Sequence, residues 1–135
     1  MEFDTKIKIV LRNDLDPWQE LNVTAFLMSG ISGTQDIIGQ PYIDKDNVHY
    51  LPMSQQPIMI HAATGDQMKD LLQKALTKDV VISIYTEELF KTYNDEDNRA
   101  IVAQFRTDEL NLVGIGIRGK KNQVDRLLKG FELHK

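Results

Sequence analysis

The stretch Lys6 to Leu11 reads Lys-Ile-Lys-Ile-Val-Leu, and the turn after it ends in Asp16-Pro17. A short β-branched run of this kind predicts a mostly buried strand. Asp16 stands where a helix N-cap is expected, and Pro17 follows at the first helical position, where a missing N–H costs nothing. The strand is therefore expected to feed into a helix, which would run to about Met28 and stop at Gly30. This helix is apolar nearly all round, which predicts that it is covered on both sides.

The rest of the chain continues to alternate between the two periodicities. Two short extended arms around a polar turn predict a hairpin between residues 37 and 53. Core strands are predicted over 57–62, 80–85 and 111–117. Helices are expected to open at Thr64, Thr86 and Asn94, and a terminal helix is expected to present apolar residues at 124, 127, 128 and 131.

This alternation predicts an α/β fold. With right-handed crossovers, helices cover both faces of the sheet, so we expect a three-layer α/β/α sandwich. The sheet would be mixed but mostly parallel, with about four core strands and the small hairpin outside it. No repeat, low-complexity tract or linker divides the chain, so residues 1–135 are expected to form one domain.

Composition excludes several classes of function. The 135 residues include no cysteine, which removes thiolate metal sites, disulfides and cysteine nucleophiles. The net charge of −4 argues against a protein that wraps phosphate backbones, although residues 118–135 carry six Lys or Arg against two acids. No signal-peptide pattern and no run of about 18 apolar residues is present, so we expect a cytoplasmic protein without a membrane partner.

One segment matches the glycine pattern of a dinucleotide-binding site. Gly114-Ile-Gly116-Ile-Arg118-Gly119 matches G-x-G-x-x-G, but the chain ends before the required strand and acidic ribose ligand could follow. We interpret its glycines as positions of close packing and predict no cofactor. Lys120 and Lys121 follow at the start of a helix and are candidates for an anion contact.

The three histidines are scattered without metal-ligand spacing, so no metal site is predicted. His61 ends a core strand, where a hydrogen-bonded core role and a role in the ligand cleft both remain open.

The strongest candidate site is a set of polar residues at strand ends. In α/β sheets, ligands bind beyond the carboxyl ends of the strands. A general base, Glu87, and oxyanion-stabilising groups are candidates for catalysis, and the neighbouring polar and aromatic residues are candidates for ligand binding. The catalytic candidates are Glu87, Arg12 and Asn13, and the ligand-binding candidates are Asp14, Trp18, Asn22, His61 and Thr86.

Several of these segments together resemble a known family. Val10-Leu11-Arg12-Asn13-Asp14-Leu15 resembles the V-x-R-x-D-L opening of the type II peptidyl-tRNA hydrolases, and Leu112 to Ile117 resembles the last strand of that family. Further segments look like an uncharacterised bacterial branch with the same fold: Asp14 to Val23, Tyr50 to Met53, Tyr85 to Glu88 and Asn98-Arg99. The resemblance implies a mixed sheet whose last strand is antiparallel, and a homodimer.

The sequence leaves two functions open. The hydrolases carry a lysine near the start of the first helix, whereas no lysine occurs between Lys8 and Lys45 here. Because that cation is missing, we favour a protein that binds a small ligand in the crevice, with Arg12 or Asn13 holding an acidic or carbonyl group and Trp18 stacking on an apolar part. The alternative is a hydrolase of an acyl ester such as peptidyl-tRNA, in which Glu87 activates water and tRNA is the partner.

Overall fold

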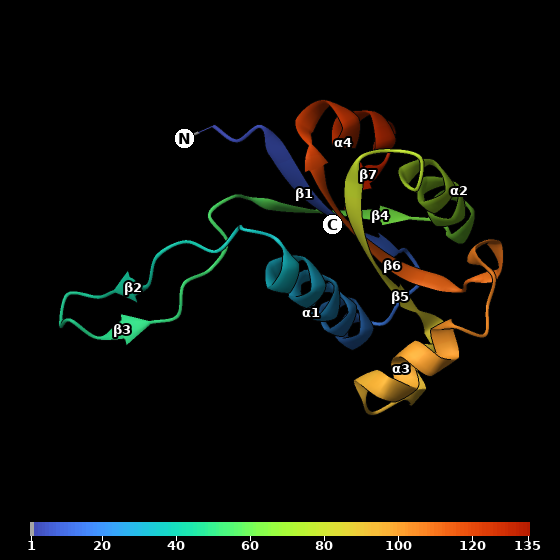
Figure 1. The fold of residues 1–135 in the computed structure, drawn as a ribbon, viewed down its shortest axis with the longest axis horizontal. Helices are drawn as coiled ribbons and strands as arrows, with labels where there is room; N and C mark the ends of the chain where they lie inside the picture. Colours follow the sequence, from blue (N-terminus) through green and yellow to red (C-terminus); the bar gives the residue numbers. More distant parts are fainter. Residues whose placement is uncertain (1) are drawn as a thin grey trace.

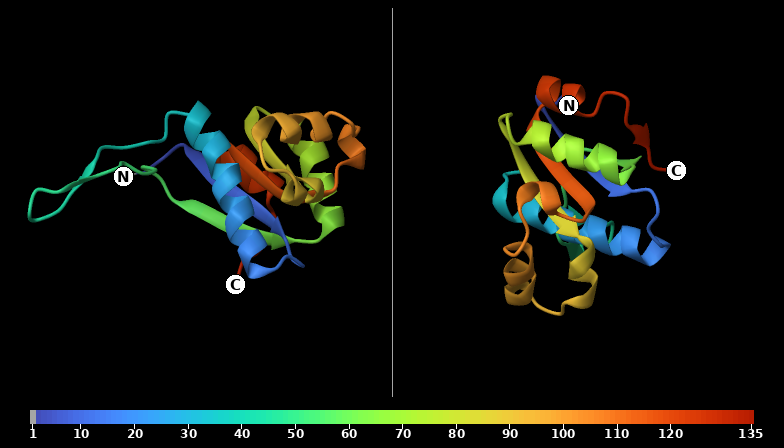
Figure 2. Two further views of the ribbon diagram at one scale, coloured as in Figure 1. Left: turned by 90° about the horizontal axis from the view of Figure 1, so that it is seen from below. Right: turned by 90° about the vertical axis from the view of Figure 1, so that its right-hand side faces the viewer.

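The computed structural model describes residues 2–135. A five-stranded sheet lies between two layers of helices, and a separate two-stranded ribbon extends from one end (Figure 1). Helix α1 (Pro17–Thr34) and the short α3 (Asp95–Val102) lie on one side of the sheet, and α2 (Gly65–Ala75) and α4 (Lys121–Leu127) lie on the other (Figure 2). The expected three-layer α/β/α class with a mixed sheet and a separate hairpin is confirmed.

The sheet has the strand order β5-β6-β1-β4-β7. These strands are β5 (Val80–Thr86), β6 (Leu112–Lys120), β1 (Thr5–Arg12), β4 (Ile58–Ala63) and β7 (Glu132–Leu133). Strands β1, β4 and β5 point in the same direction, while β6 and β7 run against them. Because β6 lies between β1 and β5, β1 and β4 form the one parallel pair among the described residues, and the other three pairs are antiparallel. The sheet is therefore mixed as expected, but the expectation that it is mostly parallel was wrong.

Strand β6 and helix α1 approach each other closely. Gly114 and Gly116 face the helix side, and a Cβ added to Gly116 would stand 2.4 Å from the Ser83 hydroxyl oxygen. That hydroxyl donates to the backbone oxygen of Leu27 at 3.1 Å, so it ties β5 to α1. These glycines therefore serve packing, as expected, and Gly119 is itself a strand residue.

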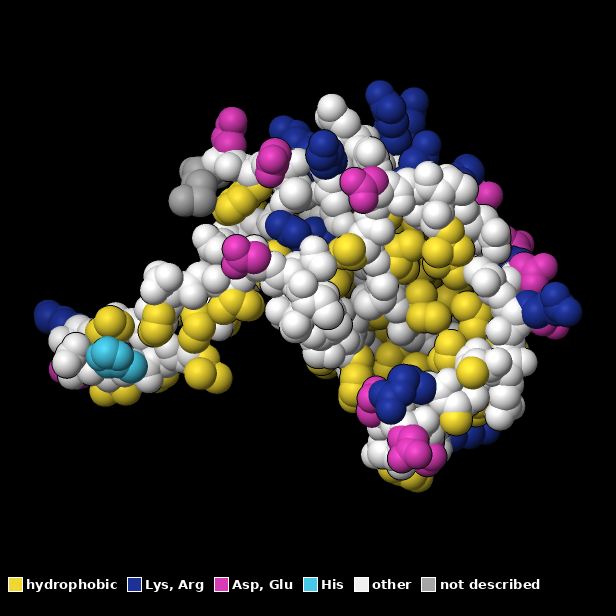
Figure 3. Space-filling model, viewed as in Figure 1, with side chains coloured by type: hydrophobic (Ala, Val, Ile, Leu, Met, Phe, Trp, Pro, Cys, Tyr) yellow, Lys and Arg dark blue, Asp and Glu magenta, His cyan; other side chains and the backbone are white. Residues whose placement is uncertain are grey.

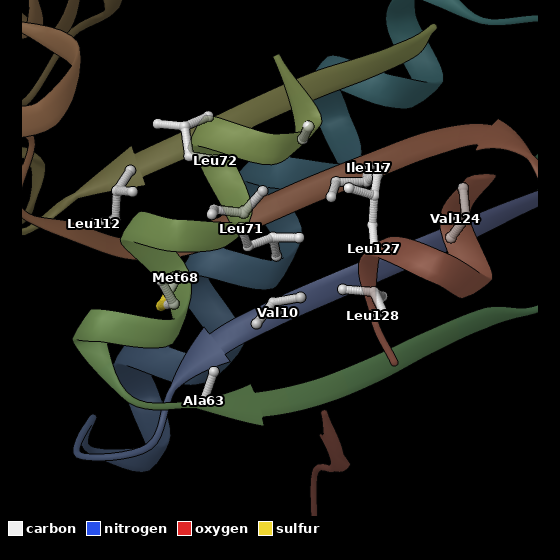
Figure 4. Packing of buried hydrophobic residues seen from close by; sticks show 12 residues of the cluster. Val10, Ala63, Met68, Leu71, Leu72, Leu112, Ile117, Val124, Leu127 and Leu128 are labelled. Carbon is white, nitrogen blue, oxygen red and sulfur yellow. The ribbon is translucent and has the colours of Figure 1, made fainter. Parts of the chain in front are cut away.

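The opposite face of the sheet carries the second core layer. Helix α2 begins with a complete capping box, in which the Thr64 hydroxyl accepts from the N–H of Gln67 and the Gln67 side chain accepts from the N–H of Thr64. Its apolar stripe packs with α4 against β1 and β6 (Figure 4), and includes Met68, Leu71, Leu72 and Ala75. Because this stripe has helical spacing, its position was predictable from the sequence.

The hairpin projects well away from the body in two perpendicular views (Figures 1 and 2). It consists of β2 (Tyr42–Ile43) and β3 (His49–Tyr50), paired antiparallel as predicted. Its root is held by Arg118 of β6, whose guanidinium donates to the side-chain oxygens of Gln35 at 3.2 Å and Gln56 at 3.4 Å. Gln35 and Gln56 flank residues 36–55, which we call the arm.

The first helix corrects two expectations. It continues through Gly30 and Gly33 to Thr34, because neither glycine takes a left-handed conformation that would end a helix. It is also not covered on both sides, since Trp18, Leu21 and Phe26 are more than half exposed.

The terminal helix is shorter than predicted and ends at Leu127, after which the chain turns into β7. Over the described residues, none of the helices has the length and apolar character needed to span a membrane.

Candidate functional site

The carboxyl end of β1 places Arg12 between two carboxylates. Its Nε lies 2.6 Å from Oδ1 of Asp14, and its Nη1 lies 3.7 Å from Oε2 of Glu87 at the end of β5. The arginine side chain is only about one-fifth exposed, whereas both carboxylates are mostly exposed. The structure thus brings together three of the residues that the sequence singled out, from two strands separated by β6.

The β5 end arranges its polar residues differently. Thr86 is buried and precedes the 3-10 helix η1 (Glu87–Lys91), but its hydroxyl makes no capping hydrogen bond. Glu88 accepts from the side-chain amide of Asn111 through one oxygen, while its other oxygen is buried without a partner among the described residues. Glu87 therefore faces Arg12, and Glu88 is turned toward the start of β6.

Aromatic rings from three elements form a continuous series next to these strand ends. Trp18 of α1 meets Phe90 of η1 edge-on, with ring centroids 5.6 Å apart. Phe90 contacts Tyr85 of β5 at 5.2 Å, and Tyr85 contacts Phe26 of α1 at 5.8 Å. Aromatic pairs at these separations and tilts are mutually favourable, so the rings form one connected wall.

The hydroxyl group of Tyr85 lies at the centre of this wall. It is within 3.4 Å of the Asn22 side-chain oxygen and of the Leu89 backbone oxygen, two long contacts. Burial raises the pKa of Tyr85 above its ordinary value, so the hydroxyl keeps its proton at neutral pH. Asn22, which the sequence suggested as a ligand-binding residue, lies beside it and keeps its amide N–H groups for other partners.

Two hollows open along this wall between α1 and α3. The first has a volume of about 340 Å³ and is lined by Trp18, Asn22 and Phe90 together with polar residues of the η1–α3 segment, including Thr92, Asn94 and Asn98. The second, of about 570 Å³, continues past Gly30 and Ser83 to Val102. Since both hollows are lined by Phe26, Tyr85, Leu89, Asp95 and Asn98, we treat them as one groove and call it the aromatic groove.

The groove combines apolar walls with amide groups. Such a surface can bind a planar or apolar body by stacking and can hydrogen-bond to its polar edge. Trp18 and Asn22 are sequence candidates that line it. Sequence reasoning did not single out Tyr85, Phe90 and Asn98 for the site. Tyr85 reads as an ordinary core-strand residue, and Phe90 and Asn98 belong to segments whose placement over α1 has no local signal.

Other candidates lie apart from the groove. Arg12, Asn13, Asp14, Thr86 and Glu87 are not among its lining residues. The backbone N–H of Asn13 donates to the carbonyl of Ala63 at 2.9 Å, which ties the ends of β1 and β4 together. The charged strand-end cluster and the groove are therefore two neighbouring features rather than one hollow.

His61 and the two lysines are further away. His61 is buried in β4, in register between Val10 of β1 and Leu133 of β7. Burial, and then the charge of Lys8, lower its pKa. Lys120 pairs with Thr5 at the opposite end of the sheet from Arg12, and Lys121 lies beside it in a hollow with Glu2 and Asp4.

Over residues 2–135, we find no group of three histidine or acidic side chains that could hold a metal ion. The groove combines amide and aromatic groups with one carboxylate, Asp95, and this set suits an organic molecule better than a metal ion.

Comparisons with known proteins define the family. The model of a family described as a protein of unknown function, DUF2000, matches residues 5–135. Among solved structures, the protein of unknown function Atu0240 from Agrobacterium tumefaciens is 43% identical and superimposes with a TM-score of 0.95, over 99% of this chain and 100% of that one. No curated protein matches the chain. These findings give no support to a type II peptidyl-tRNA hydrolase fold, but they confirm the expectation of an uncharacterised family. The chain belongs to the DUF2000 family, whose function is not known.

Proposed function

We propose that this protein binds a small organic molecule with a planar or apolar body in the aromatic groove. The observation that carries the proposal is the connected series Trp18–Phe90–Tyr85–Phe26, which borders a hollow lined by amide side chains. Most small-molecule sites combine such apolar walls with a few polar groups that fix the orientation of the ligand.

Asn22 supports this function by its position in the wall. It lies at an exposed position of α1 that borders the groove, and its side-chain oxygen accepts from the Tyr85 hydroxyl at 3.4 Å. Its amide N–H groups are left to donate to a carbonyl or carboxylate of the ligand. Stacking on Trp18 and donation from Asn22 together would orient the molecule.

The strand-end cluster would contribute at the edge of the groove. Arg12 is already paired with Asp14 and Glu87, so an incoming carboxylate would have to compete with two anions for it. This pairing favours a ligand with a neutral carbonyl over one with a strong negative charge near Arg12. Asn13, exposed beside Arg12, would offer a second neutral contact.

The chain supplies its own reporter for a test. Trp18 is the single tryptophan and borders both the groove and the exposed side of α1, so its fluorescence reports on this region, and the Phe90→Ala variant identifies a change that comes from the groove. We would screen metabolites by thermal shift and titrate the hits against Trp18 fluorescence. A ligand of the groove should change that fluorescence in a saturable way. Trp18→Ala and Phe90→Ala should each weaken binding about tenfold or more, as expected for the loss of roughly 1–2 kcal/mol of stacking.

The control removes an aromatic ring elsewhere. Phe3 lies near the opposite end of the sheet, against Lys121, so Phe3→Ala should leave affinity unchanged. Equal affinity in the Trp18→Ala, Phe90→Ala and Phe3→Ala variants, measured by calorimetry, would show that the ligand binds elsewhere and would remove the proposal.

A second candidate function is hydrolysis of an acyl ester such as peptidyl-tRNA. It is favoured by the approach of Glu87 to Arg12 at 3.7 Å, which places a carboxylate base beside a cation at two strand ends. Turnover that falls at least 100-fold in Glu87→Gln but not in Glu109→Gln, a similarly exposed carboxylate, would support it. If tRNA is the partner, binding should also weaken steeply with salt, whereas binding of a neutral ligand in the groove should barely respond.

A further inference from the structure

The arm, residues 36–55, has a well-formed tip. At that tip, one carboxylate oxygen of Asp44 accepts from the backbone N–H groups of Asp46 and Val48, and the other accepts from the hydroxyl of Tyr50 at 2.7 Å. These bonds lower the pKa of Asp44, so it remains ionised and the turn is held by charge-assisted hydrogen bonds. The arm is thus an ordered element and not a loose loop.

The surface of the arm is unusually apolar for a projecting element. Figure 3 shows apolar side chains along the projecting segment. Seven large apolar residues of the arm are 38% to 86% exposed: Ile38, Tyr42, Ile43, Val48, Tyr50, Leu51 and Met53. A two-stranded ribbon is at best marginally stable alone in water, and monomeric proteins rarely expose contiguous apolar surface of this extent. The arm therefore needs a surface to pack on.

Helix α1 provides a second apolar surface that its own chain leaves open. Leu21 is 74% exposed, and Trp18 and Phe26 flank it on the same outer side of the helix, with Ala25 between them. We call these four residues the α1 outer face. The arm of the same chain cannot cover it, because the arm leaves the body beyond the C-terminal end of α1 and points away (Figures 1 and 2).

The areas fit a pair of identical chains. At about 200 Å² for a fully exposed large residue, the arm presents roughly 800 Å² of apolar surface over the whole ribbon, and the α1 outer face presents roughly 350 Å². Because the smaller surface limits each contact, two reciprocal contacts would bury roughly 1,400 Å² in total, which lies in the range of stable interfaces. The body also fixes the direction of the arm, since Arg118 holds both segments at its root. A rigid projecting element can therefore reach a second copy without a large loss of conformational entropy.

We propose that the arm is an interaction element for a second copy of this chain, and that the arm of each copy packs on the α1 outer face of the other. A two-fold axis satisfies both open surfaces at once, because each chain gives one arm and receives one. The contact is apolar, with the charged tip residues Asp44, Lys45 and Asp46 left at its edge. Trp18 and Phe26 also border the aromatic groove, so the arm of the partner copy would cover the edge of the groove, but the pairing requires no ligand there.

Mass in solution tests the pairing. Sedimentation equilibrium of the full chain should show a dimer at micromolar concentration. Leu51→Glu, at the most exposed apolar residue of the arm, should raise the dissociation constant at least 100-fold, and so should Leu21→Glu on α1. Leu76→Glu, at the leucine that follows α2 as its C-cap and is 56% exposed, should leave the dissociation constant unchanged. Unaltered far-UV circular dichroism in all three variants establishes that they fold.

The absence of cysteine permits a direct test of the contact. Two differently tagged copies, one with Leu51→Cys and one with Ala25→Cys, would be co-expressed and treated with a short bismaleimide. Cross-links between the two tags should dominate, whereas a Leu76→Cys copy should give none with Leu51→Cys. A monomeric wild-type chain, dimerisation that survives Leu51→Glu, or cross-links confined to arm against arm would each overturn the proposal.

Discussion

Gly114 of β6 lies directly under Val23 of α1, so that a Cβ at position 114 would stand 2.4 Å from the Val23 Cγ1 and 2.9 Å from the Leu27 Cδ1. Both neighbours are buried core side chains with nowhere to move. We expect Gly114→Ala to lower the free energy of unfolding by about 1–3 kcal/mol through overpacking, as measured by urea denaturation. Wild-type stability in this variant would mean that α1 does not pack on β6 at this distance.

At Gly33, in contrast, substitution by alanine should make the protein more stable. It lies inside α1, and no atom comes within 4 Å of the site where its Cβ would be placed. Alanine is the better helix former, so Gly33→Ala should raise the free energy of unfolding by roughly 0.5–1 kcal/mol. A loss of stability in the same urea experiment would contradict the continuation of the helix past Gly30.

His61 should make stability depend on pH. Burial and Lys8 lower its pKa in the folded state below the ordinary value of 6.5. Between the folded and unfolded pKa values, the unfolded chain binds more protons, so stability falls as the pH decreases below about 6.5 and is fully restored above it. Urea midpoints at about pH 5 and about pH 7.5 should differ less in His61→Leu than in the wild type. An identical pH dependence in both proteins would assign the effect to other groups.

Thr64 should contribute to stability through its cap. Its hydroxyl accepts from the N–H of Gln67 in the first turn of α2. Thr64→Ala should therefore destabilise the fold by about 1 kcal/mol, measured as a shift of the thermal midpoint. Thr107→Ala, at an exposed position, should change it by less than about 0.5 kcal/mol.

Glu87 should matter little for stability. It is mostly exposed, and its oxygen lies 3.7 Å from the guanidinium of Arg12, which has a closer partner in Asp14. Glu87→Gln should cost less than about 1 kcal/mol in chemical denaturation, as exposed ion pairs generally do. Any loss of binding or turnover in this variant can then be attributed to the site, whereas a large loss of stability would assign Glu87 a structural role.

Local signals in the sequence were sufficient for most of the elements. Pro17 and the bond from the Asp16 N–H to the Gln19 side chain mark the start of α1, and Thr64 marks the start of α2. These signals act within one turn of chain, so the sequence alone discloses them. The Gly30 stop was wrong because a glycine ends a helix only where the chain adopts a left-handed turn, and that depends on the packing beyond it.

The site was less accessible to sequence reasoning because its parts meet through tertiary packing. The position of β6 between β1 and β5 depends on long-range packing that no local pattern encodes. This strand order brings Arg12 near Glu87 but leaves both residues outside the lining of the aromatic groove. Phe90 and Tyr85 were overlooked for the same reason, since their role depends on the position of α1 above them. Polar residues after strands indicated the end of the sheet at which Arg12 and Glu87 meet, but not on which side of the sheet the aromatic groove lies.

The shape of the hairpin and its orientation on the body depend on different contacts. The turn at Asp44 is closed by bonds within the hairpin itself, whereas the link between Gln35 and Gln56 depends on a guanidinium from a different strand. Backbone bonds between residues 37–39 and 53–55, a bond from Gln56 to Thr5 and the buried Ile37 also hold the root. Loss of the guanidinium would therefore remove one of several tethers, so the ribbon would keep its internal shape while its range of angles to the sheet widens.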